Sequence, residues 1–370
     1  MSGTDVRRRP SGIRPSEGVV VDAVAPKQGI SHPARPAGAA MKVIALEEHF
    51  VTDEVMRLGK SVDPRWRDDS AGFMQPGSDM MTRIRDLGDE RIRLMDDSGV
   101  DVQVLSLTAP GVQNLDAADA RGAASRVNDL IASTVAGRPD RFQGFATLPT
   151  PDPAAAAREL ERAVEQLGLE GAMIFGRTRD RNADAPEFTP IYEAAAALRV
   201  PLYLHPQIPD RPVRDSYYSG LGNELDLNLA MGGVGWHYDT GLQLLRLILS
   251  GTFDRFPDLQ IIAGHWGEVV LFYLERIDIL SSSAKKLDRP VADYLRSNVY
   301  VTPSGIFSQR YLRWAIDVMG VDRILFSTDY PYVYQRENWA RAFLDQSSLS
   351  AEDRNKVAHG NWDHLRERRS

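Results

Sequence analysis

The sequence contains no cysteine among its 370 residues. Disulfides and thiolate metal sites are therefore excluded, and any bound metal must be held by histidine, aspartate, glutamate or water. The lack of cysteine also suits a reducing compartment, so we expect the protein to be cytoplasmic.

Other features are missing as well. No apolar run is long enough to cross a membrane, so we expect no membrane partner. The net charge is only -7, with acidic and basic residues interspersed, which leaves no footprint for nucleic acid. No glycine-rich phosphate loop follows the first strand-like segment, which disfavours a nucleotide cofactor. We therefore expect a small molecule as the binding partner.

The first forty residues differ in composition from the rest of the chain. They are rich in proline, arginine, serine and glycine, as in Arg7-Arg8-Arg9-Pro10. This composition is typical of a disordered tail, and no apolar stretch of the length of a secretory signal follows the arginines. We expect residues 1–40 to be a disordered N-terminal extension, with Met41 a candidate for the natural first residue. Residues 41–366 are expected to form a single domain.

From residue 41 onward, strand-like apolar segments alternate with helix-like ones. The strand-like segments are 43–50, 101–107, 142–149, 171–175, 201–206, 261–268, 299–302 and 323–331. The helix-like segments are 80–97, 117–136, 152–167, 190–198, 240–249, 268–280, 310–319 and 351–364. Such alternation indicates an α/β fold with a parallel sheet, and eight strands favour a closed (β/α)8 TIM barrel. The long loop after Pro206 either has a function or conceals a further element.

The first strand-like segment ends in residues that could bind a metal, as active-site residues of barrels do. Glu47 and His49 are two residues apart and point the same way, so both can reach one ion, while Glu48 points outward. The short Glu-x-His pattern is also compatible with a solvated strand end.

Two more candidate ligands end other strands. His205, before Pro206, is a ligand or a hydrogen-bonded core residue. Asp329 ends a buried strand, where a carboxylate needs a compensating charge such as a cation; alternatively it caps a helix. With Glu47 and His49 these residues form a set of one glutamate, two histidines and one aspartate. This set suits one divalent ion, Zn2+ or Mn2+.

A second polar pair lies where the sixth strand passes into a helix. His265 and Glu268 stand beside Gly264 and Gly267, which permit a tight turn. Histidine titrates near neutral pH, so the functional interpretation is a general acid/base pair. The alternative is a packed turn residue and a helix-capping carboxylate.

Residues that could contact a substrate are aromatic or cationic. Arg276 lies two helical turns beyond Glu268, where it would bind an anion or form a surface salt bridge. The aromatic candidates, each of which could equally belong to the core, are Phe73, Phe175, Trp236, Tyr330 and Tyr332.

As a set, these segments resemble the decarboxylase-like branch of the amidohydrolase superfamily, from Met41 to about Leu365. That branch includes the γ-resorcylate, 2,3-dihydroxybenzoate and aminocarboxymuconate-semialdehyde decarboxylases. The most specific stretches are Ala45-Leu46-Glu47-Glu48-His49-Phe50, Tyr203-Leu204-His205-Pro206, Gly264-His265-Trp266-Gly267-Glu268 and Ile324-Leu325-Phe326-Ser327-Thr328-Asp329-Tyr330-Pro331.

The resemblance implies a distorted (β/α)8 barrel of the metal-dependent hydrolase type with one divalent metal. The residues that match the metal positions are Glu47, His49, His205 and Asp329. The residues that match the catalytic positions are His265 and Glu268, and Asp329 is also expected to act in catalysis. Arg276 matches an arginine that helps complete a neighbouring subunit's site, so a homodimer or homotetramer is expected.

Two departures from the γ-resorcylate enzymes concern the substrate pocket. Phe175 stands near a position where those enzymes have an asparagine. The loop that contains Tyr217-Tyr218 and Trp236-His237 is not a close match either. The resemblance therefore predicts the metal chemistry of this protein better than it predicts the identity of the substrate.

The leading hypothesis is non-oxidative decarboxylation of an aromatic or conjugated, hydroxylated carboxylic acid. Asp329, held by the metal and His265, would protonate the carbon that bears the carboxylate, and no redox cofactor is needed. The alternative is a hydrolase or hydratase that uses metal-activated water on the same site. A non-catalytic, ligand-binding descendant is a third possibility, which the presence of all the site residues disfavours.

Overall fold

The computed structural model describes residues 41–68, 77–284 and 287–369. The chain divides into two units, Met1–Ala40 and Met41–Ser370, and the description below concerns the second unit. The expected N-terminal extension, residues 1–40, and the candidate substrate contact Phe73 lie outside the described residues.

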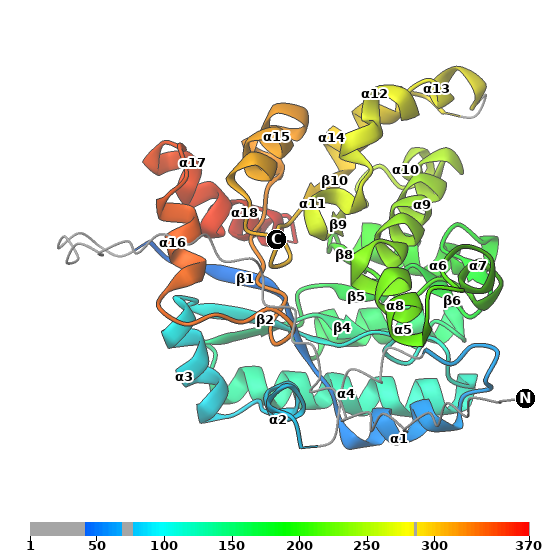
Figure 1. The fold of residues 1–370 in the computed structure, drawn as a ribbon, viewed down its shortest axis with the longest axis horizontal. Helices are drawn as coiled ribbons and strands as arrows, with labels where there is room; N and C mark the ends of the chain where they lie inside the picture. Colours follow the sequence, from blue (N-terminus) through cyan, green and yellow to red (C-terminus); the bar gives the residue numbers. More distant parts are fainter. Residues whose placement is uncertain (1–40, 69–76, 285–286, 370) are drawn as a thin grey trace, which may run out of the picture. The chain divides into compact units, whose positions relative to one another are not determined.

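The second unit is built on parallel strands surrounded by helices (Figure 1). One sheet has the order β1-β2-β3, and a second has the order β10-β9-β8-β5-β4, with parallel pairing throughout. The strands are β1 (Ile44–Phe50), β2 (Val102–Leu107), β3 (Phe142–Gly144), β4 (Ala146–Thr147), β5 (Ala172–Phe175), β8 (Leu202–His205), β9 (Ile261–Ala263) and β10 (Val299–Val301). A short antiparallel pair, β6 (Arg177–Thr178) and β7 (Arg181–Asn182), lies beyond β5.

Backbone hydrogen bonds join the two sheets on both sides. Phe145 N donates to Leu105 O at 2.9 Å and Ala146 N donates to Gly171 O at 2.8 Å, so β3 and β4 act as one strand interrupted at Phe145. On the other side, segment 324–330 pairs with β10 through Ile324 and with β1 through Tyr330. Eight neighbouring segments therefore form a closed ring, as the strand count predicts, although the eighth is too irregular to be a continuous strand.

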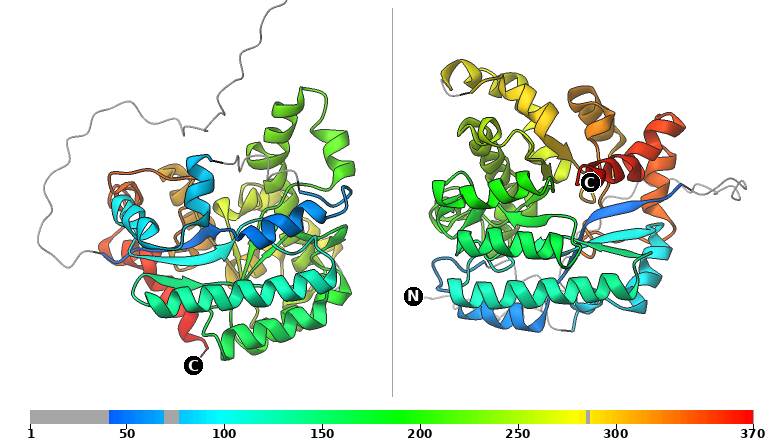
Figure 2. Two further views of the ribbon diagram at one scale, coloured as in Figure 1. Left: turned by 90° about the horizontal axis from the view of Figure 1, so that it is seen from below. Right: turned by 180° about the vertical axis from the view of Figure 1, so that it is seen from behind.

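Most helices follow from their sequence signals. Asp152 caps α5 (Pro153–Glu165) by accepting from Ala155 N, and Pro153 begins the helix. The helix α4 (Ala117–Gly137) agrees with the predicted 117–136 and runs beside α5 (Figure 2). Within the described ranges, the other helices of six residues or more are α1 (Asp53–Ser61), α6 (Thr189–Ala197), α9 (Gly235–Leu249), α14 (Val291–Asn298), α15 (Gln309–Met319), α16 (Trp339–Asp345), α18 (Asn361–Glu367) and four introduced below.

Two sequence-based expectations about helices are wrong. The predicted helix 80–97 is two helices, α2 (Asp79–Arg85) and α3 (Asp89–Ser98), because the backbone is extended at Asp86 and Gly88. The predicted helix 268–280 is broken: a left-handed turn precedes short helical pieces such as α12 (Leu274–Ile277). The long segment after Pro206 does conceal further elements, α7 (Arg211–Tyr217) and α8 (Asn223–Asn228), which is one of the two alternatives that the sequence left open.

Two apolar layers stabilise the ring. One fills the barrel interior with residues such as Leu46, Phe145 and Tyr203. The larger layer lies between strands and helices, and Val43 and Ala45 of β1 belong to it. Among the described residues, no helix has both the length and the apolar character needed to span a lipid bilayer.

Phe145 provides a test of the closed ring. Its side chain is fully buried, with ring centroids 5.9 Å from Tyr203 and 5.6 Å from Trp362. We expect Phe145→Ala to lower the free energy of unfolding by about 3–5 kcal/mol, because it leaves a cavity in the barrel. Urea unfolding followed by circular dichroism measures this. The control Leu130→Ala, on the exposed side of α4, should cost less than about 1 kcal/mol, and equal midpoints for the two variants would contradict the packing.

Candidate metal centre and catalytic site

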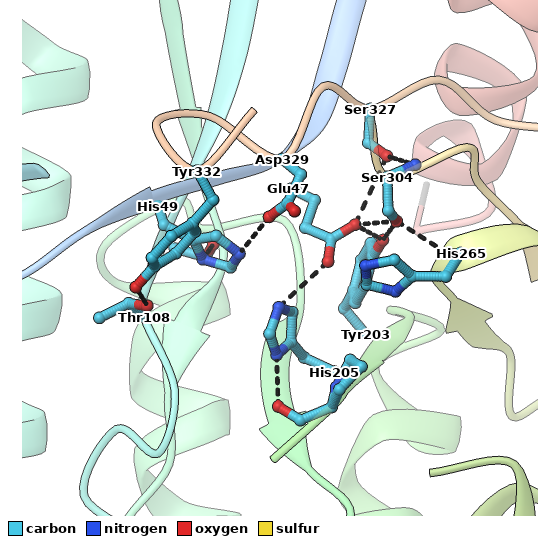
Figure 3. Close-up of polar contacts among 12 residues, drawn as sticks. Glu47, His49, Thr108, Tyr203, His205, His265, Ser304, Ser327, Asp329 and Tyr332 are labelled. Carbon is cyan, nitrogen blue, oxygen red and sulfur yellow. Dashed lines mark hydrogen bonds and ion pairs between the residues drawn. The ribbon is translucent and has the colours of Figure 1, made fainter. Parts of the chain in front are cut away.

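Four buried or nearly buried side chains converge at the carboxyl ends of the strands. One ligand-type atom from each lies within 4.8 Å of the others, and the residues are Glu47, His49, His205 and Asp329. Glu47 and His49 come from β1, His205 ends β8, and Asp329 belongs to the irregular segment 324–330. Figure 3 shows the four side chains turned toward one another.

An irregularity in β1 gives two of these side chains their direction. Ile44 and Leu46 belong to the barrel interior, so regular alternation would send Glu48 inward. The register with β2 shifts between Ala45 and Glu48, and a shift of this kind re-aims side chains. Glu47 and His49 therefore share the inner side, as their spacing predicts.

Hydroxyl groups hold one oxygen of the Glu47 carboxylate. Its Oε2 accepts hydrogen bonds from Tyr203 OH at 2.6 Å and from Ser304 Oγ. Its Oε1 is buried without a hydrogen-bond partner and lies 3.1 Å from Nε2 of His205. Burial alone would raise the pKa of Glu47, but His205 and the nearby histidines outweigh burial and lower it.

The tautomer of His205 shows that these residues suit a cation. Its Nδ1 lies 2.7 Å from Pro206 O, and a carbonyl only accepts, so Nδ1 carries the hydrogen. If the ring is neutral, Nε2 presents a lone pair to Glu47 Oε1, which also carries only lone pairs, whereas a proton on Nε2 would make the same contact a hydrogen bond. Two lone pairs facing each other repel, and a positive ion between or beside them would relieve the repulsion.

His49 offers a further unpaired lone-pair atom. Its Nδ1 lies 3.2 Å from Ser106 Oγ, while its buried Nε2 has no hydrogen-bond partner and lies 3.5 Å from Asp329 Oδ1. Burial lowers the pKa of His49, so the imidazole is neutral and able to bind a metal. The donor set of two neutral imidazoles and two carboxylates fits Zn2+ or Mn2+.

Asp329 occupies a strained position beside this set. Its φ is 62°, a left-handed conformation that is uncommon outside glycine. Burial, and then the charge of Glu47, raise the pKa of Asp329 well above its ordinary value. A bound cation would act in the opposite direction, so Asp329 is suited both to bind an ion and to carry a proton.

The outward-facing Glu48 supports the ligands from behind. It accepts hydrogen bonds from Thr328 N at 2.9 Å, from Thr328 Oγ1 at 2.7 Å and from Gln103 Nε2 at 2.9 Å. Arg91 donates to Gln103 Oε1 at 2.6 Å and to His49 O at 2.9 Å. Burial raises the pKa of Glu48 to about 8. This network ties β1 to the segment that carries Asp329.

A second cluster adjoins the first. The buried Glu268 carboxylate lies 2.7 Å from Nδ1 of His265 through Oε1 and 2.8 Å from Nδ1 of His237 through Oε2. Burial alone would lower the pKa of His265, but the charge of Glu268 outweighs burial and raises it to about 10. Glu268 therefore favours the cationic form of His265. From the sequence, His237 is recognised only as part of a loop that differs from the γ-resorcylate enzymes, and its contact with Glu268 is not predicted.

The residues predicted to contact a substrate do not all lie in the same place. Phe175 packs its ring 5.5 Å from that of His205, and Tyr332 packs its ring 5.7 Å from that of His49. Trp236 donates its indole N–H to His237 Nε2 at 3.1 Å. The Tyr330 ring lies over the guanidinium of Arg91 at 4.6 Å. Arg276 is exposed on α12.

Comparison with known proteins identifies the family. The model of the amidohydrolase family matches residues 44–361, so the chain belongs to the amidohydrolase family. It is 40% identical over 337 residues to γ-resorcylate decarboxylase of Polaromonas sp. strain JS666, covering 87% of this chain and 97% of that protein. It is 37% identical over 335 residues to γ-resorcylate decarboxylase of Rhizobium sp. strain MTP-10005, covering 86% and 96%.

Solved structures are similar as well. A dihydroxybenzoic acid decarboxylase from Polaromonas sp. JS666, with bound manganese and the inhibitor 2-nitroresorcinol, superposes with a TM-score of 0.77 at 37% identity, covering 89% of this chain and 97% of that one. A 5-carboxyvanillate decarboxylase from Novosphingobium aromaticivorans with manganese gives a TM-score of 0.80 at 33% identity, covering 88% and 96%. The resemblance inferred from the sequence motifs and the expected barrel class are confirmed.

The geometry predicts that metal binding depends on His205. We expect His205→Ala to weaken binding by at least the roughly tenfold to hundredfold found for residues that merely support ligands. Mass spectrometry of dialysed protein measures the metal content. The control His359→Ala removes a histidine that pairs with Asp363 at 2.9 Å outside the cluster, and it should retain the metal. Full metal content in His205→Ala would contradict the assignment.

Proposed function

We propose that this chain is a metal-dependent, non-oxidative decarboxylase of a hydroxylated aromatic carboxylic acid. One observation carries the proposal: four ligand-type side chains converge beside His265, whose Nδ1 lies 2.7 Å from the buried Glu268 carboxylate. The relatives named above are γ-resorcylate, dihydroxybenzoate and carboxyvanillate decarboxylases, which supports a small hydroxybenzoate as the substrate. The cofactor is one divalent metal ion, for which the manganese in those structures supports Mn2+ over Zn2+.

The residues have separate roles in this proposal. Glu47, His49, His205 and Asp329 hold the ion. When bound, a divalent cation supplies positive charge that orients the substrate's carboxylate and neighbouring hydroxyl oxygen and stabilises negative charge on them. The aromatic rings of Phe175, Trp236 and Tyr330 are proposed to shape the pocket for the substrate ring, and the role of Phe73 stays a prediction from the sequence.

Protonation of the substrate ring is the chemical step that the chain performs. Asp329 gives its proton to the ring carbon that bears the carboxylate. The bond between that carbon and the carboxylate then breaks, carbon dioxide leaves, and the electron pair of the bond returns to the ring. Cationic His265, sustained by Glu268, stabilises the Asp329 carboxylate after the proton has left. No oxidant is consumed.

Carbon dioxide release tests this reaction. Metal-loaded protein is incubated with a panel of hydroxybenzoates, and we expect a phenol and carbon dioxide in equal amounts. In heavy water the product should carry deuterium at the carbon that lost its carboxylate. No turnover of the panel, with oxygen from labelled water entering an ester or lactone product, would favour a hydrolase or hydratase instead.

The Asp329→Asn variant tests the proton donor. We expect kcat to fall by about a hundredfold or more, because an amide cannot deliver the proton. The fold should be retained, as judged by circular dichroism. Asp363→Asn, which changes a carboxylate on α18 outside the site, is the matched control and should keep the wild-type rate. Comparable rates for Asp329→Asn and the wild type would exclude this role.

Assembly into a homodimer or homotetramer is also proposed. Large apolar side chains of α9 and the pieces that follow β9 are exposed, among them Leu242 at 53%, Phe272 at 66% and Ile279 at 55%. An exposed group of this kind is typical of an interface. Arg276 lies in the same stretch, which supports its expected contribution to a neighbouring subunit's site. The cytoplasmic location stays a prediction.

Light scattering tests the assembly. We expect Phe272→Asp to reduce the molar mass toward that of one chain, because a carboxylate in an apolar interface lacks a partner. Leu130→Asp, on the exposed side of α4, should leave the mass unchanged. A wild-type mass equal to one chain would refute the proposal.

A further inference from the structure

His237 contacts the catalytic pair but has no role in the proton transfer proposed above. It lies in the first turn of α9, and its ring centroid is 4.6 Å from that of His265. Both imidazoles reach the same carboxylate, with Nδ1 of His265 at Oε1 of Glu268 and Nδ1 of His237 at Oε2. The Glu268 side chain is fully buried, so no solvent competes for either oxygen.

The hydrogen-bond chemistry of this triad is determined by the carboxylate. An ionised carboxylate only accepts, so Nδ1 of each histidine donates. Both oxygens are thereby occupied and the plane of the carboxylate is set. His265 is left with Nε2 as its second ring nitrogen, and the charge of the ring acts on Glu47 and Asp329.

The other nitrogen of His237 has its own partners. Trp236 Nε1 donates to it at 3.1 Å, and an indole N–H can only donate. This places the hydrogen of neutral His237 on Nδ1, toward Glu268. The carbonyl oxygen of Gly232 lies at 3.3 Å from the same Nε2 and would accept from the cationic form. Either form therefore donates to Glu268.

The backbone around Glu268 explains the need for an outside anchor. Every residue from His265 to Val269 has a positive φ, with values of 46°, 59°, 84°, 51° and 61°. A run of left-handed residues cannot continue into a regular helix, and each non-glycine member is strained. Side-chain contacts must therefore help to hold the turn.

The helix α9 is placed to supply that anchor. A Cβ at Gly241 would collide with the carbonyl oxygen of Glu268, so glycine permits close approach of α9 to the turn. Arg177 also ties Asp239 of α9 to the chain beyond β5 through an ion pair of 3.0 Å. His237 thus projects from a firmly held helix onto a strained turn.

We propose that His237 is a positioning residue for the proposed decarboxylation. By holding Oε2 of Glu268 it keeps Oε1 directed at Nδ1 of His265, and so keeps His265 in the orientation that serves Asp329. This role rests on the proposed function, because it acts through the residues assigned to proton transfer.

Two substitutions of His237 separate the effect of its hydrogen bond to Glu268 from the effect of the space that its side chain fills. In His237→Asn the amide nitrogen stands close to where Nδ1 stood and can still donate to Glu268, whereas His237→Leu fills space but cannot donate. With metal-loaded full-length protein, we expect kcat to fall about tenfold or more in His237→Leu and to stay within about threefold of wild type in His237→Asn. KM and metal content should remain close to wild type in both.

A spectroscopic measurement reports on the bond itself. In protein labelled with nitrogen-15 histidine, the hydrogen on Nδ1 of His265 should resonate far downfield, and His265→Gln identifies that signal by removing it. We expect the signal to move or vanish in His237→Leu and to persist in His237→Asn.

The outcomes divide cleanly. Loss of both rate and signal in His237→Leu, with both retained in His237→Asn, supports the proposal. An unchanged signal in His237→Leu, or equal losses in the two variants, overturns it. If wild-type protein turns over no hydroxybenzoate, the proposed function fails, and the resonance alone then decides whether His237 orients the Glu268–His265 pair.

Discussion

The site depends on how the two oxygens of Glu47 are used. Hydroxyls of Tyr203 and Ser304 bind one oxygen, so the carboxylate cannot rotate to satisfy the other. That other oxygen lies 3.1 Å from Nε2 of His205, in a buried setting. With neither a proton nor a cation between them, two such electron-rich atoms would be unfavourable in a low-dielectric interior. A divalent cation bound by both atoms would replace this repulsion with two favourable contacts. The other residues of the centre are placed around the position of that cation.

Two levels of support produce this arrangement. The closed ring brings the end of the first strand against the end of the last, and the register shift in β1 aims Glu47 and His49 inward. Behind them, Glu48 and Arg91 fix the backbone through buried polar contacts. The proton-transfer side is organised differently, by side chains acting on a strained turn at His265. Ligand positions therefore follow from strand geometry, whereas the histidine cation follows from local electrostatics.

Sequence alone predicts which candidate ligands lie together better than it predicts their surroundings. Glu47 and His49 follow from the two-residue period of a strand, and His205 and Asp329 follow from their places at strand ends. The barrel follows from the count of alternating segments. His237 could not be predicted, because its relation to Glu268 depends on how α9 packs over a left-handed turn. The apolar run 268–280 resembles a helix in period, but the strain beginning at His265 breaks it. Tyr203 stands in an apolar strand, and nothing in the sequence indicates that its hydroxyl donates to Glu47.

The hydrogen bonds from Thr328 to Glu48 lie on the seam where the ring closes. Ligands on the two sides of that seam, Glu47 with His49 and Asp329, are separated by about three-quarters of the chain, so the centre cannot exist in a partly synthesised or opened barrel. An ion bound there would join the first strand to the segment that closes the ring. Its binding free energy would add directly to the stability of the closed form.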